Sequence, residues 1–254
     1  MNFGMNSLLL VGTDTGVGKT TLAVGLLRLA ARAQLGIAPY KPVESGYSTD
    51  RPDDSDAASL LRASSRNDLT LADVCPYRLS QAVAPAVAAR MEAASIDPVG
   101  IVAQALRLRA VASALLIETA GGLLSPLAPN FTARSLISSL RDALPVDILL
   151  VAANRLGAIN HAALSAEALL VKGIKCSGVV LMNTADGDPV VQATNPDEIV
   201  RATGLPALGT LPYLGDRARD PDVVADSTRN HLELSSLFGG RLTHSPQRPQ
   251  RNPK

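Results

Sequence analysis

Several common sequence features are scarce in this chain of 254 residues, and each shortage excludes a class of protein. There is no Trp, and aromatic residues make up only 3% of the sequence, so the hydrophobic core has to be built from aliphatic side chains and Ala. Cys occurs only twice, as Cys75 and Cys176. This is too few for a disulfide framework, and the spacing is not that of a metal site. We therefore expect both Cys to be small core residues.

Long apolar runs, a targeting segment and an excess of charge are also missing. No apolar stretch approaches the roughly 20 residues that cross a bilayer, and the first residues lack the basic and apolar parts of a signal peptide. The formal net charge is +1, so no overall field attracts nucleic acid or an anionic membrane. We expect a soluble, cytoplasmic protein with a single α/β domain over residues 1–240 and a disordered, basic, Pro-rich tail over residues 241–254.

A glycine-rich segment near the N-terminus has the sequence context of a phosphate-binding loop. Residues 12–20 read GTDTGVGKT, an apolar run precedes them, and Leu22, Leu26 and Leu29 recur after them at helical spacing. In such a strand, loop and helix, backbone N–H groups and the helix dipole bind phosphate. Lys19 can then reach the β- and γ-phosphates, and the Thr20 hydroxyl can bind Mg²⁺.

The loop is a variant of the common pattern G-x-x-x-x-G-K-[ST]. Position 13, where that pattern has Gly, is Thr13, and Gly12 lies one residue earlier. The alternative is a glycine-rich turn with a chance Gly-Lys-Thr, which the flanking strand and helix disfavour.

The rest of the chain alternates between apolar runs and helical patterns. The runs predict buried strands at residues 8–11, 37–40, 114–117, 147–152, 177–182 and 207–211. Helical spacing predicts helices around residues 101–112, 132–144 and 160–172, the last with Gly173 as its C-cap. Strands alternating with helices predict a mostly parallel sheet with helices on both faces. In such a sheet, ligands bind where the strands end at their carboxyl side.

Polar residues follow several of these strands. Lys41 comes directly after the second strand, where it is either a surface charge or a cation aimed at the nucleotide. Glu118 follows the third strand, before Gly121 and Gly122, which is the layout of a Walker-B-like metal ligand or of a surface salt bridge. An acidic stretch at residues 53–56 caps a helix or holds Mg²⁺, and its composition does not choose among its three Asp residues.

The last two strands end in residues suited to contacts with a base. Asn183 can recognise adenine through its amide or form an Asx-turn. Pro212 ends the last strand, and the loop at residues 212–214 can lie along a base or ribose.

Taken together, these segments resemble dethiobiotin synthetase, the ATP-dependent enzyme family of biotin biosynthesis. The resemblance covers about residues 7–215, and its motifs occur in the family's order. They are residues 12–20 (GTDTGVGKT), 41–46 (KPVESG), 55–57 (SDA), 118–122 (ETAGG), 157–161 (GAINH) and 211–214 (LPYL).

The resemblance implies a P-loop NTPase-like α/β fold, a homodimer, and an ATP- and Mg²⁺-dependent ligase. Such an enzyme carboxylates 7,8-diaminononanoate with CO₂ and closes a ureido ring. It implies that nucleotide contacts come from Thr15, Gly16, Val17, Gly18, Lys19, Thr20, Glu118, Thr119, Ala120, Gly121, Asn183, Thr184, Pro212, Tyr213 and Leu214. It implies Mg²⁺ ligands at Thr20, Asp56 and Glu118, catalytic roles for Lys41, Lys19 and Thr15, and substrate contacts from Ser45, Gly121 and, across the dimer interface, Asn160.

Thr119 departs from the family, in which many members have Gly. A side chain at this position could crowd the substrate or the nucleotide.

Two other functions share parts of this pattern. A switch ATPase of the partitioning or division-site kind has a variant loop with a signature Lys, but this chain has Asp14 at that place. An amidotransferase-type ligase needs a glutaminase domain with a Cys nucleophile, for which 254 residues leave little room.

Overall fold

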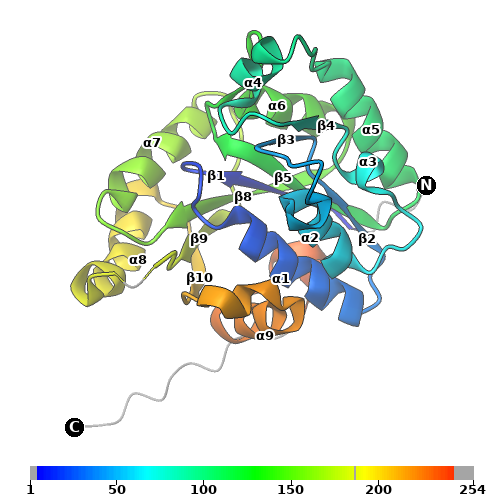
Figure 1. Cartoon of the computed structure of the whole chain (residues 1–254). Coiled ribbons are helices and arrows are strands. Elements are labelled where there is room, and N and C mark those ends of the chain that lie inside the picture. The colour runs from blue at the N-terminus through cyan, green and yellow to red at the C-terminus, as the bar shows by residue number, and fades with distance from the viewer. Residues whose placement is uncertain (1–4, 186, 243–254) are drawn as a thin grey trace, which may run out of the picture.

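The computed structural model describes residues 5–185 and 187–242, and a six-stranded parallel sheet lies at its centre (Figure 1). The strand order is β10-β9-β8-β1-β5-β2, and every neighbouring pair is parallel. These strands are β1 (Ser7–Gly12), β2 (Ile37–Tyr40), β5 (Ala114–Gly122), β8 (Val146–Ala153), β9 (Gly178–Met182) and β10 (Ala207–Leu211). The predicted parallel sheet is confirmed.

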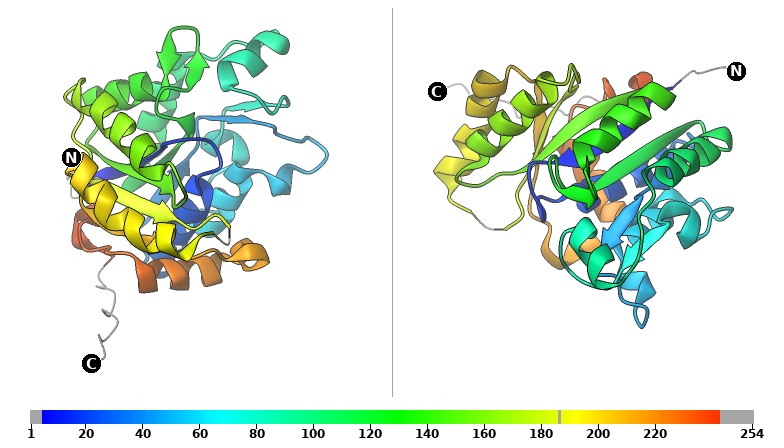
Figure 2. Two further views of the ribbon diagram at one scale, coloured as in Figure 1. Left: turned by 90° about the vertical axis from the view of Figure 1, so that its left-hand side faces the viewer. Right: turned by 90° about the horizontal axis from the view of Figure 1, so that it is seen from above.

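Helices cover both faces of the sheet, and each face buries its own core cluster (Figures 1 and 2). Within β1, Leu8 and Leu10 face one cluster, whereas Leu9 and Val11 face the other, as the period of a strand requires. The first cluster packs under α1 (Lys19–Arg32), α2 (Asp56–Ser64) and α9 (Pro221–His231). The second packs under α5 (Pro98–Ala110), α6 (Ala133–Ala143), α7 (Ala158–Leu170) and α8 (Pro189–Thr203). Both Cys are buried and unpaired, as expected.

Short elements occupy the connections. Two small two-stranded sheets pair β3 (Val43–Ser45) with β4 (Tyr77–Leu79) and β6 (Pro126–Ala128) with β7 (Phe131–Thr132). The remaining helical pieces are η1 (Pro52–Asp54), α3 (Leu71–Val74), α4 (Pro85–Met91), η2 (Gly215–Arg219) and η3 (Leu237–Gly240).

Several predicted boundaries were wrong, among them those of the helix expected around residues 101–112, which is α5 over Pro98–Ala110. The strand expected to end at Ile117 continues as β5 to Gly122, because Glu118 and Gly122 still pair with β1. Helix α7 begins two residues before the predicted start, and Val171, not Gly173, follows it as the C-cap. Gly173 instead adopts a left-handed φ of 63° and donates its N–H to Leu170 O, closing the turn after the helix.

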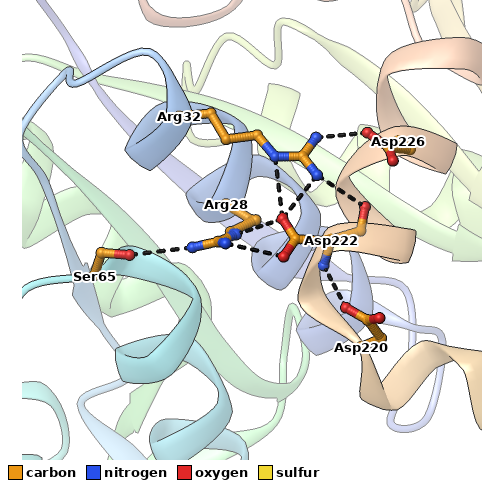
Figure 3. Close-up of polar contacts among 6 residues, drawn as sticks. All are labelled: Arg28, Arg32, Ser65, Asp220, Asp222 and Asp226. Carbon is orange, nitrogen blue, oxygen red and sulfur yellow. Dashed lines mark hydrogen bonds and ion pairs between the residues drawn. The ribbon is translucent and has the colours of Figure 1, made fainter.

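Helix α9 is held against α1 by a cluster of ion pairs (Figure 3). The guanidinium of Arg28 donates to both carboxylate oxygens of Asp222, at 2.7 and 2.9 Å. Arg32 binds Asp222 at 2.7 Å and Asp226 at 2.5 Å. Because these groups are partly exposed, we attribute to them a role in aligning the two helices more than a large stabilisation.

The end of the chain falls largely outside the described residues. Of the tail predicted over residues 241–254, only Arg241 and Leu242 are described, and Leu242 is buried in the core under α9. Within residues 5–185 and 187–242, no helix combines the length and apolarity that a membrane span requires.

Candidate active site at the carboxyl edge of the sheet

The glycine-rich loop joins the end of β1 to the start of α1, as its sequence predicts. Gly16 and Gly18 adopt left-handed φ angles of 71° and 94°. A Cβ at Gly12 would lie 2.7 Å from both Asp14 O and Lys19 Nζ, so no side chain fits there. Thr13 is half-buried and carries a side chain, so the loop accommodates a Cβ at position 13 but not at position 12.

Lys19 folds back over this loop. Its ammonium donates to Asp14 O at 3.1 Å, and the residue is buried. Burial, together with the nearby charge of Lys41, holds the pKa of Lys19 below its ordinary value, although Glu118 and Asp56 oppose this shift. The ammonium is thus held at the loop with little water around it, where its attraction to phosphate is screened least.

Four side chains from separate elements meet beside the loop. Lys41 Nζ lies 2.5 Å from Glu118 Oε1 and 2.9 Å from Asp56 Oδ2, and the Thr20 hydroxyl donates to Glu118 Oε1 at 2.8 Å. Lys41 is 4% exposed and Glu118 is 1% exposed, so neither is a surface charge. Of the two interpretations of Lys41, the one that directs it toward the nucleotide loop agrees with this position.

The charges in this cluster shift the pKa of Lys41 and of Asp56. Burial alone would lower the pKa of Lys41, but the carboxylates of Glu118 and Asp56 outweigh it and raise the pKa above its ordinary value. Loss of water contacts would raise the pKa of Asp56, but the charge and hydrogen bond of Lys41 outweigh it and leave the pKa lowered. The cluster is therefore a charged one, with a cation between two carboxylates.

The same oxygens match the ligand preferences of Mg²⁺. Glu118 Oε2 is buried and has no hydrogen-bond partner among the described residues, so one acceptor is left for a cation. Thr20, Asp56 and Glu118 together offer a hydroxyl and two carboxylates, the hard oxygen set that Mg²⁺ binds. No group of three or more His, Cys, Asp and Glu side chains gathers in the described part of the chain, so this candidate site consists of two carboxylates and a hydroxyl. The residues present therefore fit the ion.

Asp56 is separated from its acidic neighbours by the geometry of the chain. Asp53 and Asp54 lie exposed on η1, where Asp54 pairs with Arg51 at 3.6 Å, whereas Asp56 opens α2 and faces Lys41. The composition of the acidic stretch did not make this choice, whereas the resemblance to the family pointed to Asp56.

Glu44 is a site residue that sequence reasoning missed. Its carboxylate accepts from the backbone N–H of Asp56 at 2.8 Å and of Ala57 at 3.0 Å, and so binds the first turn of α2. Burial raises the pKa of Glu44, and the nearby positive charge of Lys41 opposes the rise. The contact spans twelve residues of sequence and leaves no local pattern, but it places Asp56 beside Lys41.

A cavity of about 390 Å³ opens over the cluster. Of the predicted site residues, its lining includes Thr15, Gly16, Gly18, Lys19, Thr20, Lys41, Ser45, Asp56, Glu118, Thr119, Ala120 and Gly121. Val17 does not line this cavity. It is 1% exposed and packs into the core under α1. Thr119 is fully buried, and its hydroxyl donates to Leu10 O on β1 at 3.3 Å, so the side chain is anchored against the sheet.

The residues predicted to contact the base lie at the ends of β9 and β10, outside that lining. The backbone N–H of Asn183 donates to Leu211 O at 2.9 Å, which places the two strand ends side by side. A Cβ on Gly18 would meet the Met182 side chain at 3.0 Å, so β9 ends against the loop. Thr184 is exposed and Tyr213 is 49% exposed.

Asn160 is not brought to the cluster within this chain. It lies exposed on the first turn of α7 and lines none of the cavities described here. Its neighbour His161 lines a second cavity, of about 470 Å³, together with Thr13, Asp14 and Leu124.

The position of the switch-ATPase signature Lys is occupied differently here. Asp14 Oδ1 accepts from the backbone N–H of Thr15 at 2.7 Å, and Asp14 Oδ2 lies 3.4 Å from Arg155. Asp14 therefore shapes the loop, and its charge is opposite to that of the signature Lys of switch ATPases.

Comparison with known proteins agrees with this geometry. A family model described as an AAA domain matches residues 6–220. The chain is 40% identical to the ATP-dependent dethiobiotin synthetase BioD of Anaeromyxobacter sp. (strain K), over 94% of this chain and 99% of that protein. It is 31% identical to the ATP-dependent dethiobiotin synthetase BioD of Bacillus subtilis (strain 168), over 92% of this chain and 98% of that protein.

Solved structures share the fold at much lower identity. The MinC:MinD cell division protein complex of Aquifex aeolicus aligns with a TM-score of 0.54 and 14% identity, over 88% of this chain and 94% of that one. A ParA family ATPase of Chlorobium tepidum TLS aligns with a TM-score of 0.52 and 14% identity, over 87% of this chain and 90% of that one. The P-loop NTPase fold is shared, and this likeness extends to the fold alone.

Proposed function

The chain belongs to the ATP-dependent dethiobiotin synthetase family, and on that premise we propose that it carboxylates 7,8-diaminononanoate with CO₂ and closes the ureido ring. The observation that carries this proposal is the buried cluster of Lys41, Glu118, Asp56 and Thr20 beside the glycine-rich loop. Such a site brings cations to the place where two anionic reactants have to meet.

Each predicted site residue takes a role in this proposal. The triphosphate lies along residues 15–20. It also contacts residues 118–121, which line the same cavity. The base and ribose contact Asn183, Thr184, Pro212, Tyr213 and Leu214. The diamine contacts Ser45 and Gly121 in the cavity.

Thr20, Asp56 and Glu118 would hold Mg²⁺. When bound, the ion supplies positive charge to the phosphate oxygens. Because Lys41 contacts both of these carboxylates, its ammonium balances their charge in the metal-free protein.

The reaction proceeds in three stages on the substrate. One amine takes up CO₂ as a carbamate and loses a proton. A carbamate oxygen then attacks the γ-phosphorus of ATP, the bond from that phosphorus to the β–γ bridging oxygen breaks, and ADP leaves a carbamic-phosphoric anhydride. The second amine attacks the carbonyl carbon and loses a proton, inorganic phosphate leaves, and the ring closes.

Lys41 and Lys19 carry most of this chemistry. The carbamate and the triphosphate are both anions, so their approach requires the positive charges that the two lysines hold at the loop. Thr15 and Ser45 line the same cavity and orient the reactants, which is the larger part of catalysis in phosphoryl transfer. No nucleophilic side chain is needed.

We further propose a cytoplasmic homodimer in which Asn160 of one subunit contacts the substrate of the other. Leu164 and Leu124 are 56% and 55% exposed, and both line the cavity that also contains His161, the neighbour of Asn160. Clustered exposed apolar side chains of this kind mark protein–protein contacts.

The proposed function is tested by the substrate dependence of ATP hydrolysis. We expect hydrolysis to require both 7,8-diaminononanoate and bicarbonate, and ¹³C-labelled bicarbonate to yield dethiobiotin one mass unit heavier. Either substrate alone should give only background. Stimulation by DNA or lipid vesicles, with no need for the diamine, would instead indicate a switch ATPase.

Replacing Glu118 tests the metal site. Glu118→Gln keeps the shape of the side chain but removes its charge, so we expect the Mg²⁺ concentration for half-maximal turnover to rise at least about tenfold. Calorimetry of Mg²⁺ binding in the presence of ADP should show the same loss without depending on turnover. Glu167→Gln, on the exposed face of α7, is the matched control. An unchanged Mg²⁺ dependence of turnover and of binding in Glu118→Gln would show that Glu118 is not a ligand of the metal ion.

A further inference from the structure

Asn183 and three other amide side chains form a chain of hydrogen bonds, and the proposed function uses only Asn183 among them. We call Asn154, Asn183, Gln192 and Asn195 the amide relay. Asn154 follows β8 and Asn183 follows β9, whereas Gln192 and Asn195 lie on α8. Asn154 and Asn195 are each 3% exposed. Buried amides are costly unless both their N–H and C=O groups are bonded, so this arrangement is a specific one.

The bonds of the relay run in one direction. Asn195 Nδ2 donates to Asn154 Oδ1 at 2.9 Å and to Arg155 O at 3.1 Å. Asn154 Nδ2 in turn donates to Asn183 Oδ1 at 3.0 Å and to Gln192 O at 3.1 Å. Asn183 Nδ2 then donates to Gln192 Oε1 at 3.3 Å.

Two backbone carbonyls fix the orientation of the Asn154 and Asn195 amides, because they determine where the NH₂ group of each lies. Carbonyl oxygens only accept, so Arg155 O requires the NH₂ end of Asn195, and Gln192 O requires the NH₂ end of Asn154. If the Asn183 amide turned over, its NH₂ group would face the NH₂ group of Asn154, two donors in contact. The amide of Asn183 therefore has one permitted orientation.

We propose that the amide relay makes the nucleotide site select bases with an amino group beside a ring nitrogen over bases with a carbonyl beside a ring N–H. Adenine is the first kind and hypoxanthine, the base of ITP, is the second. The inference rests on the proposed function, which places the base at Asn183. Asn154, which touches Asn183 but not the base, is the positioning residue.

The selection between the two kinds of base follows from the hydrogen-bonding groups of Asn183 that the relay does not occupy. Beyond its bonds within the relay, its amide retains one oxygen lone pair and one N–H. An amino group can donate to that oxygen while the ring nitrogen accepts from that N–H. Hypoxanthine would present a carbonyl to the oxygen and an N–H to the NH₂ group. A freely turning amide would accept either base, so the discrimination depends on Asn154 holding the amide.

The test compares ATP with ITP, which differ only at this edge of the purine. The measured quantity is the ratio of kcat/KM for ATP to kcat/KM for ITP in dethiobiotin formation by the full chain. Asn154→Leu preserves side-chain size but cannot hold Asn183, and we expect this ratio to fall about tenfold, mainly through a change in KM. If that variant does not fold, Asn154→Ser serves, because its hydroxyl can donate or accept and so permits both orientations.

Two controls separate this role from a merely structural one. Thr194→Val removes a side-chain bond to Val190 O on the same helix, at 2.8 Å, and should leave the ratio unchanged. The affinity for tripolyphosphate, which has no base, should be the same in Asn154→Leu and the unaltered protein. A loss of tripolyphosphate affinity equal to the loss of ATP affinity would show general damage and overturn the proposal.

Asn183→Ala distinguishes the base contact of Asn183 from the positioning role of Asn154. We expect it to reduce the ratio as far as Asn154→Leu or further, and the double variant to show no additional loss, because Asn154 acts through Asn183. An unchanged ratio in Asn183→Ala would place the base elsewhere and overturn the proposed contact. A reduced ratio in Asn183→Ala with a normal ratio in Asn154→Leu would keep that contact and overturn the relay.

Discussion

Replacing Lys41 with Met is expected to lower kcat about a thousandfold while the protein still binds ATP. Met keeps the length of the buried side chain but removes the ammonium that lies between Glu118 and Asp56. Removing one preorganised donor from the site of charge development typically costs 10²–10³-fold in kcat, and Lys41 also carries a full charge. The measurement is the rate of dethiobiotin formation at saturating substrates, with ATP affinity determined separately by calorimetry.

The same variant should change the response of stability to Mg²⁺. Without the ammonium, buried Glu118 loses the cation in direct contact with it and keeps only the more distant charge of Lys19, which destabilises the metal-free protein by about 3–5 kcal/mol. Mg²⁺ would supply the missing charge, so it should raise the melting temperature more in Lys41→Met than in the unaltered protein. Lys172→Met, an exposed position after α7, is the control for both measurements. Near-normal turnover in Lys41→Met would exclude Lys41 from the mechanism.

The sheet and the main helices could be predicted because their residues are apolar on buried faces. Strands such as β1 are covered on both sides, so they are continuous apolar runs, and their ends identify the edge where Lys41 and Asn183 lie. The continuation of β5 through Glu118 was missed because polarity normally marks the end of a buried strand. Here the polar residues remain paired with β1.

The parts of the site that could not be predicted depend on contacts between distant segments. Glu44 binds the N-terminus of α2 across a connecting loop, and Asn154 meets Asn195 across 41 positions. Neither residue type nor spacing distinguishes such side chains from surface ones. Asp56 is an intermediate case: its neighbours have the same chemistry, and only the fold turns Asp53 and Asp54 outward.

The second large effect is expected at Lys19, where nucleotide binding and turnover should fail together. Lys19→Ala removes the ammonium that lies 3.1 Å from Asp14 O over the loop, and with it the charge that faces the β- and γ-phosphates. We expect kcat/KM for ATP to fall about a thousandfold or more, and the affinities for ATP and ADP to fall while that for AMP changes little. Calorimetry with the three nucleotides measures this directly.

Lys19→Arg is the informative companion, because it keeps the charge and changes only the shape. Lys19 Nζ lies so close to the loop that it would be only 2.7 Å from a Cβ on Gly12, and we expect the larger, forked guanidinium of Arg to fit poorly there. We therefore expect Lys19→Arg to be nearly as inactive as Lys19→Ala. Lys41→Met, by contrast, should lose turnover but retain its affinity for ATP. This difference would show that Lys19 binds the nucleotide and that Lys41 acts in the reaction. Unchanged ATP affinity in Lys19→Ala would contradict that division, since a lysine held at the phosphates cannot be removed without weakening their binding.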